Sequence, residues 1–303
     1  MKQRIISSIG LAVLVSVSLV TPALAVVSID YAFVGNANNA ADPLTGYGSV
    51  DHANNIGTYE VTNSQYAEFL NAKGSSNNYG VYRSNMESNG ISQVGSPGGY
   101  SYTVTSGLEN RPVVSVSWFT AARFINWLAN GQGSGDTETG AYSLGGTTSG
   151  NAFAKISGAT IYLPSENEWY KAAYYNGTTS SYSLYPNGQN SITMADANYW
   201  PGLGFSTDIG SYNADPSFYG TFDQGGNVWE WNDLDALFGS SRGLRGGSWF
   251  GIGDYDLSSS RRYTTNPSDD ADTLGFRVAS VPEPTSVILA IFGSGMMLIR
   301  RKR

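Results

Sequence analysis

Two apolar segments, one at each end of the chain, confine the folded part of this protein to the residues between them. The first follows two cations, Lys2 and Arg4, and extends over residues 5–20 before small residues appear at Ala23 and Ala25. A basic start, an apolar run and alternating small residues are typical of a secretory signal peptide. The run is short and contains serine, which favours a cleaved leader over a membrane anchor. We expect residues 1–25 to be removed on export, with cleavage after Ala25.

The C-terminal segment places its charges last. Pro282, Glu283 and Pro284 precede an apolar stretch over residues 285–299, and the chain ends on four cations at residues 300–303. The stretch is shorter than the roughly 20 residues that span a bilayer, but a basic cluster behind it would keep the tail on the cytoplasmic side. Successive cations do not easily enter a protein core, so a buried helix is disfavoured. We expect a short transmembrane segment at residues 285–299.

This ending resembles the PEP-CTERM sorting tail of Gram-negative bacteria, in which a Pro-Glu-Pro motif, a short apolar segment and a basic end occur in that order. The resemblance covers residues 282–303. It implies export across the inner membrane and transient anchorage there until an exosortase-type enzyme cuts near the motif. The protein is then released or attached at the cell surface, in that family often together with exopolysaccharide.

The body at residues 26–281 is acidic. Of the 17 basic and 24 acidic side chains, the end segments hold six of the basic ones but only Glu283 among the acidic ones, so the body carries a formal charge of about −12. Nucleic-acid binding requires a basic footprint, and we therefore expect no nucleic-acid partner. An excess of carboxylates instead favours hard cations such as calcium.

Cysteine is absent from the chain, and His52 is the only histidine. Disulfides, thiolate nucleophiles, zinc–sulfur sites and multi-histidine metal centres are therefore excluded. Glycine, serine, asparagine and tyrosine are abundant, which indicates a loop-rich fold with aromatic packing rather than a helical bundle. No shift in composition marks a boundary, so we expect one domain over residues 26–281.

Three helices can be placed from their capping residues. The hydroxyl of the capping residue accepts a hydrogen bond from a backbone amide in the first turn of the helix. In a capping box, the side chain of the third helical residue also accepts a hydrogen bond from the backbone amide of the capping residue. Glu166 and Glu168 resemble an acid–base pair, but their place in such a turn favours helix stabilisation. The predicted starts are Thr62 with Gln65, Ser117 with the periodic apolar residues behind it, and Ser165 with Glu168.

Six motifs then occur in one order along the body: residues 59–66, 111–118, 163–169, 226–231, 245–249 and 275–277. Together they resemble the formylglycine-generating enzyme family, also called sulfatase-modifying factors, over about residues 55–280. The resemblance implies a single large α/β (α+β) domain of the C-type-lectin-like, sulfatase-modifying factor type. Such a domain has long loops and little regular secondary structure.

The chain lacks the residues that carry the chemistry of this family. Family oxidases use two cysteines shortly after the Arg-Gly-Gly-Ser segment to bind copper and to oxidise a sulfatase cysteine to formylglycine. The corresponding stretch here, residues 250–256, contains no thiol, and copper(I) requires soft ligands. A relative that builds sulfoxides with non-haem iron uses several histidines, which this chain also lacks. We expect no copper and no formylglycine formation.

A calcium site is predicted around a Gly-Gly-Asn turn. Asp223 and Glu230 lie on either side of this turn, and calcium takes carboxylate and carbonyl oxygens at flexible geometry. The resemblance implies that the ligands are Asp223, the carbonyls of Gly226 and Val228, and Glu230. The alternative is a metal-free turn in which Glu230 caps backbone amides.

The resemblance also implies a second calcium site. It would begin at Asn198, with the Tyr199 carbonyl beside it. Its downstream ligands are not evident in this sequence. Elsewhere, we expect Arg245 and Arg277 to brace buried carboxylates or loop carbonyls. Most tryptophans of the motifs should lie in the core, namely Trp118, Trp169, Trp229, Trp231 and Trp249.

The stretch around the lost cysteines, here called the former active-site region, comprises Gly251, Asp254, Asp256, Arg261 and Arg262. The leading hypothesis is a non-catalytic, exported binding or surface-structural module that presents loops to a glycan or an envelope protein. The rival is an enzyme with repurposed chemistry at these carboxylates and arginines, which a deep pocket with a strongly raised carboxylate pKa would support. Oxidation of a sulfatase cysteine ranks third.

Overall fold

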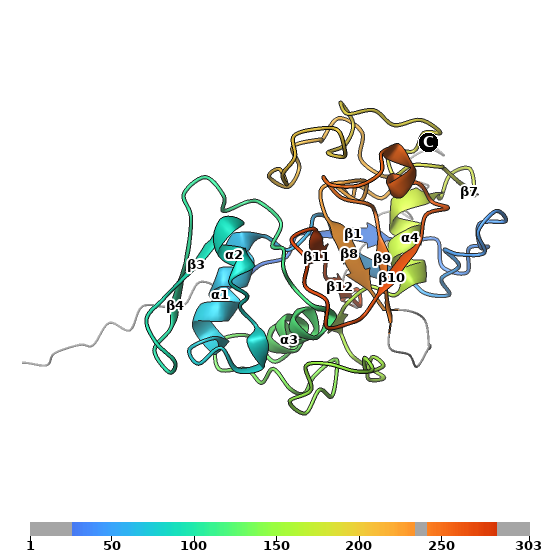
Figure 1. The fold of residues 1–303 in the computed structure, drawn as a ribbon. Coiled ribbons are helices and arrows are strands. Elements are labelled where there is room, and N and C mark those ends of the chain that lie inside the picture. Colours follow the sequence, from blue (N-terminus) through green and yellow to red (C-terminus); the bar gives the residue numbers. More distant parts are fainter. Residues whose placement is uncertain (1–25, 234–240, 284–303) are drawn as a thin grey trace, which may run out of the picture.

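The computed structural model describes residues 26–233 and 241–283 (Figure 1). The predicted leader at residues 1–25, Pro284 and the predicted transmembrane segment at residues 285–299 lie outside the described residues, whereas Pro282 and Glu283 lie within them. Within the described ranges, none of the helices combines the length and the apolar character that a membrane crossing requires.

Short strands form two four-stranded sheets. The first has the order β1 (Tyr31–Val34), β2 (Asn54–Gly57), β12 (Ala279–Ser280), β5 (Ile161–Tyr162), with every neighbouring pair antiparallel. The second has the order β10 (Tyr263–Thr265), β9 (Arg242–Arg245), β8 (Trp229–Asn232), β11 (Leu274–Phe276), and only β11 and β8 are parallel in it. Two hairpins complete the described strands: β3 (Ile91–Val94) with β4 (Ser101–Val104), and β6 (Tyr175–Asn176) with β7 (Ser181–Tyr182).

The helices are short and lie around these sheets. Figure 1 shows α1 and the hairpin β3–β4 on one side of the second sheet and α4 on the other. Their bounds are α1 (Asn63–Lys73), α2 (Asn85–Ser88), α3 (Trp118–Ala129) and α4 (Glu166–Tyr174), with 3-10 turns η1 (Asn78–Gly80) and η2 (Asp254–Leu257).

The three predicted helix starts are confirmed. Thr62 and Gln65 form a complete capping box at the head of α1, and Ser117 accepts the amide bond that opens α3. Ser165 and Glu168 form a second complete capping box at the head of α4. These starts were predictable because both partners lie within one turn of chain.

The main core is aromatic and centres on α3, in which residues 118–128 are all buried. Phe124 packs against Tyr66 and Phe69 of α1 and against Phe276 of β11, with ring centroids 5.4–5.8 Å apart. These contacts join the first helix to the last strands of the chain. Aromatic side chains bury the largest area per residue, so a few such contacts can hold a fold with little regular structure.

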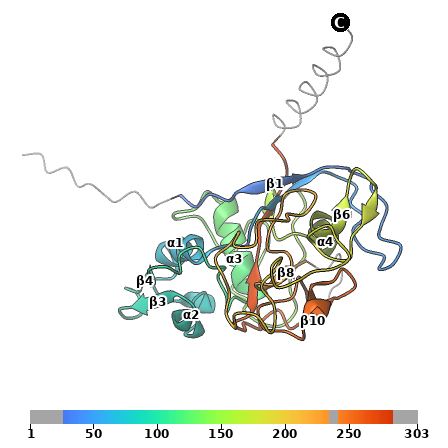
Figure 2. The same cartoon turned by 90° about the horizontal axis from the view of Figure 1, so that it is seen from above.

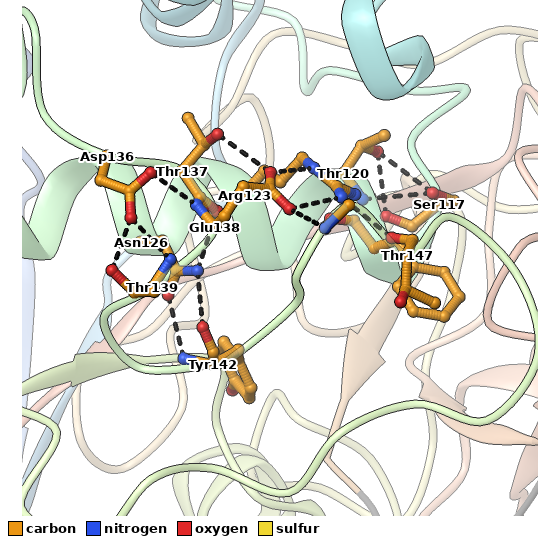
Figure 3. A network of polar contacts seen from close by, with 12 residues as sticks. Ser117, Thr120, Arg123, Asn126, Asp136, Thr137, Glu138, Thr139, Tyr142 and Thr147 are labelled. Carbon is orange, nitrogen blue, oxygen red and sulfur yellow. Dashed lines mark hydrogen bonds and ion pairs between the residues drawn. The ribbon is translucent and has the colours of Figure 1, made fainter.

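The long segment after α3 is attached to that helix by buried polar groups (Figure 3). Arg123 is fully buried, and its Nε and Nη2 bond to Glu138 at 2.8 and 3.0 Å. Asn126 donates to the carbonyls of Thr137 and Tyr142 and accepts the Tyr142 amide, each at 2.9 Å. Because buried polar groups must be satisfied, this network fixes the path of a segment that has no strand within residues 130–158.

Candidate functional site

The former active-site region rests on the head of α4. Glu166 is buried at this helix start, and its carboxylate receives Arg245 Nε and Nη2 at 3.0 and 2.7 Å. Arg262 Nε lies 2.7 and 2.9 Å from the two oxygens of the same carboxylate. Arg245 also donates through Nη1 to the carbonyls of Ser259 and Arg261. The prediction that Arg245 braces a buried carboxylate and loop carbonyls is confirmed.

The stretch that replaces the family's cysteines folds onto Asp256. This carboxylate is buried, accepts the Ile252 amide at 3.0 Å and pairs with Arg261 Nε at 3.1 Å. A Cβ atom added at Gly251 would lie 2.6 Å from Asp256 Oδ2. Asp254 lies on η2, and its Oδ2 is 3.4 Å from the Tyr185 hydroxyl. The structure therefore joins Asp256 to Arg261 and Arg262 to Glu166, and both arginines serve as counter-ions.

Exposed aromatic side chains surround this region. Phe250 is 60% exposed and Trp200 is 47% exposed, and their rings meet edge to face with centroids 6.0 Å apart. Trp249 lies against Phe250 at 5.6 Å. We call Trp200, Trp249 and Phe250 the aromatic platform. Scattered exposed apolar residues are ordinary, but a contiguous aromatic group marks an interaction surface.

The prediction that all five motif tryptophans lie in the core is wrong for one of them. Trp118, Trp169, Trp229 and Trp231 are buried, whereas Trp249 is only partly buried, because it lies between the buried Ser248 and the exposed Phe250. Sequence reasoning also missed Trp200. Its apolar neighbours in a glycine-rich stretch, Leu203 and Phe205, are exposed as well. The sequence offered one signal for an exposed position, namely an aromatic residue that fits neither a strand period nor a helix period.

Beside the aromatic platform, Arg261 supports two further exposed rings. Its guanidinium carbon lies 5.6 Å from the Tyr255 ring centroid and 5.7 Å from that of Tyr263. Tyr263 in turn lies 5.9 Å from Trp229. A cation over these ring faces stabilises them, so the aromatic side chains are held by the same arginine that pairs with Asp256.

The predicted calcium residues lie in a buried cluster of carboxylates around Arg277. The Nε and Nη2 atoms of Arg277 reach the two oxygens of Glu230 at 2.5 and 2.6 Å, and the Trp169 indole donates to Glu230 at 2.7 Å. Arg277 also donates to the Gly57 and Phe222 carbonyls, which confirms its predicted bracing role. Glu230 is thus satisfied by an arginine and an indole, whereas the metal-free alternative expected backbone amides.

The other acids of this cluster have fewer partners. Burial raises the pKa of Asp223 to about 6, although the Gly210 amide and Arg277 oppose the shift. Burial, with Asp223 and Glu230 nearby, also raises the pKa of Glu60 well above its ordinary value. One oxygen of Glu60 accepts Asn227 Nδ2 at 3.1 Å, and the other is buried without a hydrogen bond. An unsatisfied buried carboxylate oxygen suits a cation or a proton.

The two predicted calcium segments pack against each other. The Asn227 amide donates to the Asn198 carbonyl at 2.8 Å, and a Cβ atom at Gly226 would lie 2.2 Å from that carbonyl oxygen. Asn198 Oδ1 is buried without a hydrogen-bond partner, while the Tyr199 carbonyl accepts the Gly202 amide.

One side-chain oxygen of Asn198 and one of Glu60 accept no hydrogen bond, and hard oxygens of this kind suit calcium. The Glu230 carboxylate, in contrast, is already paired with Arg277. In the described part of the chain, no three acidic or histidine side chains form a metal-binding group. Calcium at Asp223, Gly226, Val228 and Glu230, or at Asn198 and Tyr199, stays a prediction.

Residues 35–281 match the family described as the Sulfatase-modifying factor enzyme 1-like domain. The chain is 29% identical over 245 residues to the inactive C-alpha-formylglycine-generating enzyme 2 of Bos taurus, a match that covers 74% of this chain and 76% of that protein. It is 26% identical over 246 residues to the serine/threonine-protein kinase pkn1 of Chlamydia caviae, covering 75% of this chain. That match spans only 33% of the kinase.

Two solved structures share the fold. Treponema denticola variable protein 1 is 24% identical with a TM-score of 0.58, and the match covers 86% of this chain and 98% of that one. CarF is 21% identical with a TM-score of 0.59, covering 85% and 100%. The predicted fold, a large α/β domain of C-type-lectin-like type with little regular secondary structure, is confirmed.

Proposed function

This chain belongs to the sulfatase-modifying factor enzyme 1-like family, and we propose that it is a non-catalytic, exported binding or surface-structural module of that family. The observation that carries the proposal is the state of the former active-site region. It has no thiol, and its buried acid Asp256 and both of its arginines are held in ion pairs. Ion pairs of this kind position a loop, and they engage Asp256 and both arginines within the protein.

The aromatic platform supports binding as the role of the surface that remains. Trp200 and Phe250 are exposed next to the ion-paired loop, and rigid aromatic side chains dominate the energy of recognition surfaces. Loops presented from a rigid base are the usual carriers of recognition. The expected partner is a glycan such as exopolysaccharide, or an envelope protein.

The two ends of the described chain lie at the same sheet, which suits attachment to a membrane on one side of the body. The first and last described strands, β1 and β12, both pair with β2, so the chain enters and leaves at one sheet. Figure 2 shows β1 along one side of the body and β10 on the other. The proposed path is export, anchorage in the inner membrane by a PEP-CTERM tail, processing by an exosortase-type enzyme, and a final place at the cell surface or outside the cell.

Calcium is part of the proposal as a structural ion. The oxygen ligands of the calcium ion would come from the two packed segments. They would include Asn198 Oδ1, which accepts no hydrogen bond, and the Asp223 carboxylate. Calcium would supply positive charge to a buried cluster in which Glu60, Asp223 and Glu230 share Arg277. The ion would hold the segment 198–207, which carries Trp200 and Phe205, against the turn at Gly226.

The test is binding of the full-length chain, purified in detergent, to native exopolysaccharide and to envelope fractions of the producing bacterium, with calcium and with a chelator. We expect saturable binding that the double variant Trp200→Ala, Phe250→Ala weakens at least about tenfold. Phe33→Ala is the matched control, since Phe33 is 49% exposed on the distant strand β1. Lack of binding to every fraction would overturn the proposal.

The enzymatic alternatives predict different results. Carboxylates whose pKa burial raises to about 6, such as Asp223 and Asp233, lie outside the former active-site region. The family reaction is tested by incubating the chain with a cysteine-containing sulfatase peptide and copper. We expect no loss of the peptide thiol, and turnover of the peptide would contradict the non-catalytic assignment.

A further inference from the structure

A cleft of about 390 Å³ lies at the C-terminal end of α4, and none of its described lining residues belongs to the aromatic platform. The hairpin β6–β7 and the loops at residues 188–190 and 216–218 form its walls. Its size falls in the range of about 300–1,000 Å³ that is typical of small-molecule sites. Its lining includes the aromatic rings of Tyr175, Tyr182 and Phe218 and the side-chain amides of Asn176, Gln189 and Asn190.

All the described residues that line this cleft are uncharged. This is unusual in a body with a formal charge of about −12. A phosphate, sulfate or uronate would meet no cation there, and a metal ion would meet no carboxylate. Burying an unpaired charge is costly, so the lining favours a ligand that is polar but neutral.

Fixed aromatic rings form part of the wall. Tyr175 and Tyr182 lie with ring centroids 4.9 Å apart, and the Tyr182 hydroxyl accepts Asn39 Nδ2 and donates to the Ala40 carbonyl, at 2.7 and 2.8 Å. Phe218 is 47% exposed and rests edge to face on Tyr219 at 5.1 Å. Rings held in this way bind with little loss of side-chain entropy, and the C–H face of a pyranose packs on them through dispersion.

Side-chain amides supply the polar groups. Asn190 Oδ1 accepts the Leu184 amide at 3.1 Å, and Asn176 Oδ1 accepts the Thr178 amide at 2.9 Å. Each of these bonds uses the oxygen, and among the described contacts neither NH₂ group donates a hydrogen bond. Gln189 bonds through its backbone only, among the described contacts. Amides both donate and accept, which matches the hydroxyl groups of a sugar.

We propose that this cleft binds an uncharged sugar residue of a glycan, stacked on the exposed ring of Phe218 and hydrogen-bonded by the amides of Asn176, Gln189 and Asn190. The inference rests on the proposed binding role but names a second surface and a ligand class for it. A peptide would use its backbone in the same cleft, and it is one of the outcomes that the test separates.

The test is titration of the full-length chain, in detergent, with neutral oligosaccharides of glucose, mannose and N-acetylglucosamine, followed by calorimetry and ligand-observed NMR. Oligogalacturonate and an uncharged peptide serve as competing probes. We expect at least one neutral oligosaccharide to bind and Phe218→Ala to weaken it about tenfold, which is the usual scale for one aromatic contact. Oligogalacturonate should bind neither the unaltered chain nor Gln189→Glu, since that change adds a negative charge to the lining.

Two controls make the outcome decisive. Phe33→Ala should leave neutral-sugar binding unchanged, and circular dichroism should show Phe218→Ala folded. Binding lost in the double variant but kept in Phe218→Ala would place the sugar at the platform and overturn this inference while sparing the proposed function. Preference for oligogalacturonate or for the peptide, or no binding of any neutral oligosaccharide, would also overturn it. Neutral-sugar binding without affinity for any envelope fraction would instead contradict the proposed function alone.

Discussion

Glu230 and Arg277 form a fully buried, two-point ion pair, with nitrogen–oxygen distances of 2.5 and 2.6 Å. Glu230 lies in β8, and Arg277 directly follows β11, the strand that pairs in parallel with β8. The pair therefore ties the Gly-Gly-Asn turn to the last motif of the chain. It also gives Glu230, which the sequence predicts as a calcium ligand, a protein partner of its own.

Breaking this pair should be costly. Glu230→Gln removes the carboxylate that is hydrogen-bonded to the buried Arg277 guanidinium, and breaking a buried pair typically lowers the free energy of unfolding by about 3–5 kcal/mol. Urea denaturation followed by tryptophan fluorescence measures the loss. Asp270→Asn is the control, because Asp270 pairs with Arg83 at the surface and surface pairs contribute little. Equal stability of Glu230→Gln and the unaltered chain would contradict the structural role.

The polar network of Figure 3 predicts a local effect. Asn126→Ala removes the partner of the Thr137 and Tyr142 carbonyls, and unsatisfied buried groups cost about 1–3 kcal/mol. Amide hydrogen exchange should quicken within residues 137–147. Asn85→Ala, at an exposed position of α2, should leave these amides largely protected. Uniform acceleration over the whole chain in Asn126→Ala would instead indicate global destabilisation.

His52 predicts a dependence of stability on pH. It contacts Glu168 through Nε2 at 2.9 Å and Asp51 through Nδ1 at 2.7 Å. The bond to Glu168 raises the pKa of His52 above 6.5. Burial opposes ionisation of Glu168, but its bonds, led by that from His52, hold its pKa below 4.5.

The sign of the effect follows from these shifts. The histidine contribution is fully present below pH 6.5 and is lost as pH rises through the raised pKa, and the glutamate contribution is lost as pH falls through the lowered pKa. The melting temperature of His52→Gln should differ from that of the unaltered chain most between about pH 4.5 and 6.5. The difference should be small, since the histidine is half-exposed. A difference that grows above pH 8 would contradict the ion pair.

Calcium should stabilise the fold if it binds the packed segments at Asn198 and Gly226. An ion that binds only the folded state at 100 times its dissociation constant adds about 2.7 kcal/mol to the free energy of unfolding. The melting temperature should rise with calcium and fall back with chelator. Asn198→Ala should abolish the rise, while Asn198→Asp, which keeps a hard oxygen, should retain it. A melting temperature that ignores calcium would remove the ion from the proposal.

The local features of the fold were predictable because they depend on residues close together in the chain. Thr62 with Gln65 and Ser165 with Glu168 complete their capping boxes within one turn. The core position of Trp118 followed from its place in an apolar helical period, since helix periodicity shows which face is buried. Trp249 was placed wrongly because no period reports whether a loop residue turns inward.

The candidate site was predictable in its composition but not in its pairing. The sequence shows that residues 250–256 contain no thiol, and the prediction that copper chemistry is absent rests on this without any coordinates. It does not show that Arg262 reaches Glu166, 96 residues away, or that Arg277 reaches Glu230, 47 residues away. One carboxylate can serve a metal, a proton or an arginine, and the chosen partner depends on which segments pack beside it.

The sequence by itself determined that the chain has no thiol, where the helices begin and which family the motifs resemble, because these depend on residue identity and on contacts within a few residues. The tertiary structure alone decided that Glu230 faces Arg277, that Asp256 faces Arg261, and that Trp200 meets Phe250 in solvent. Such contacts join segments far apart in the chain, and they exist only when the packed core has fixed the path of the loops between them.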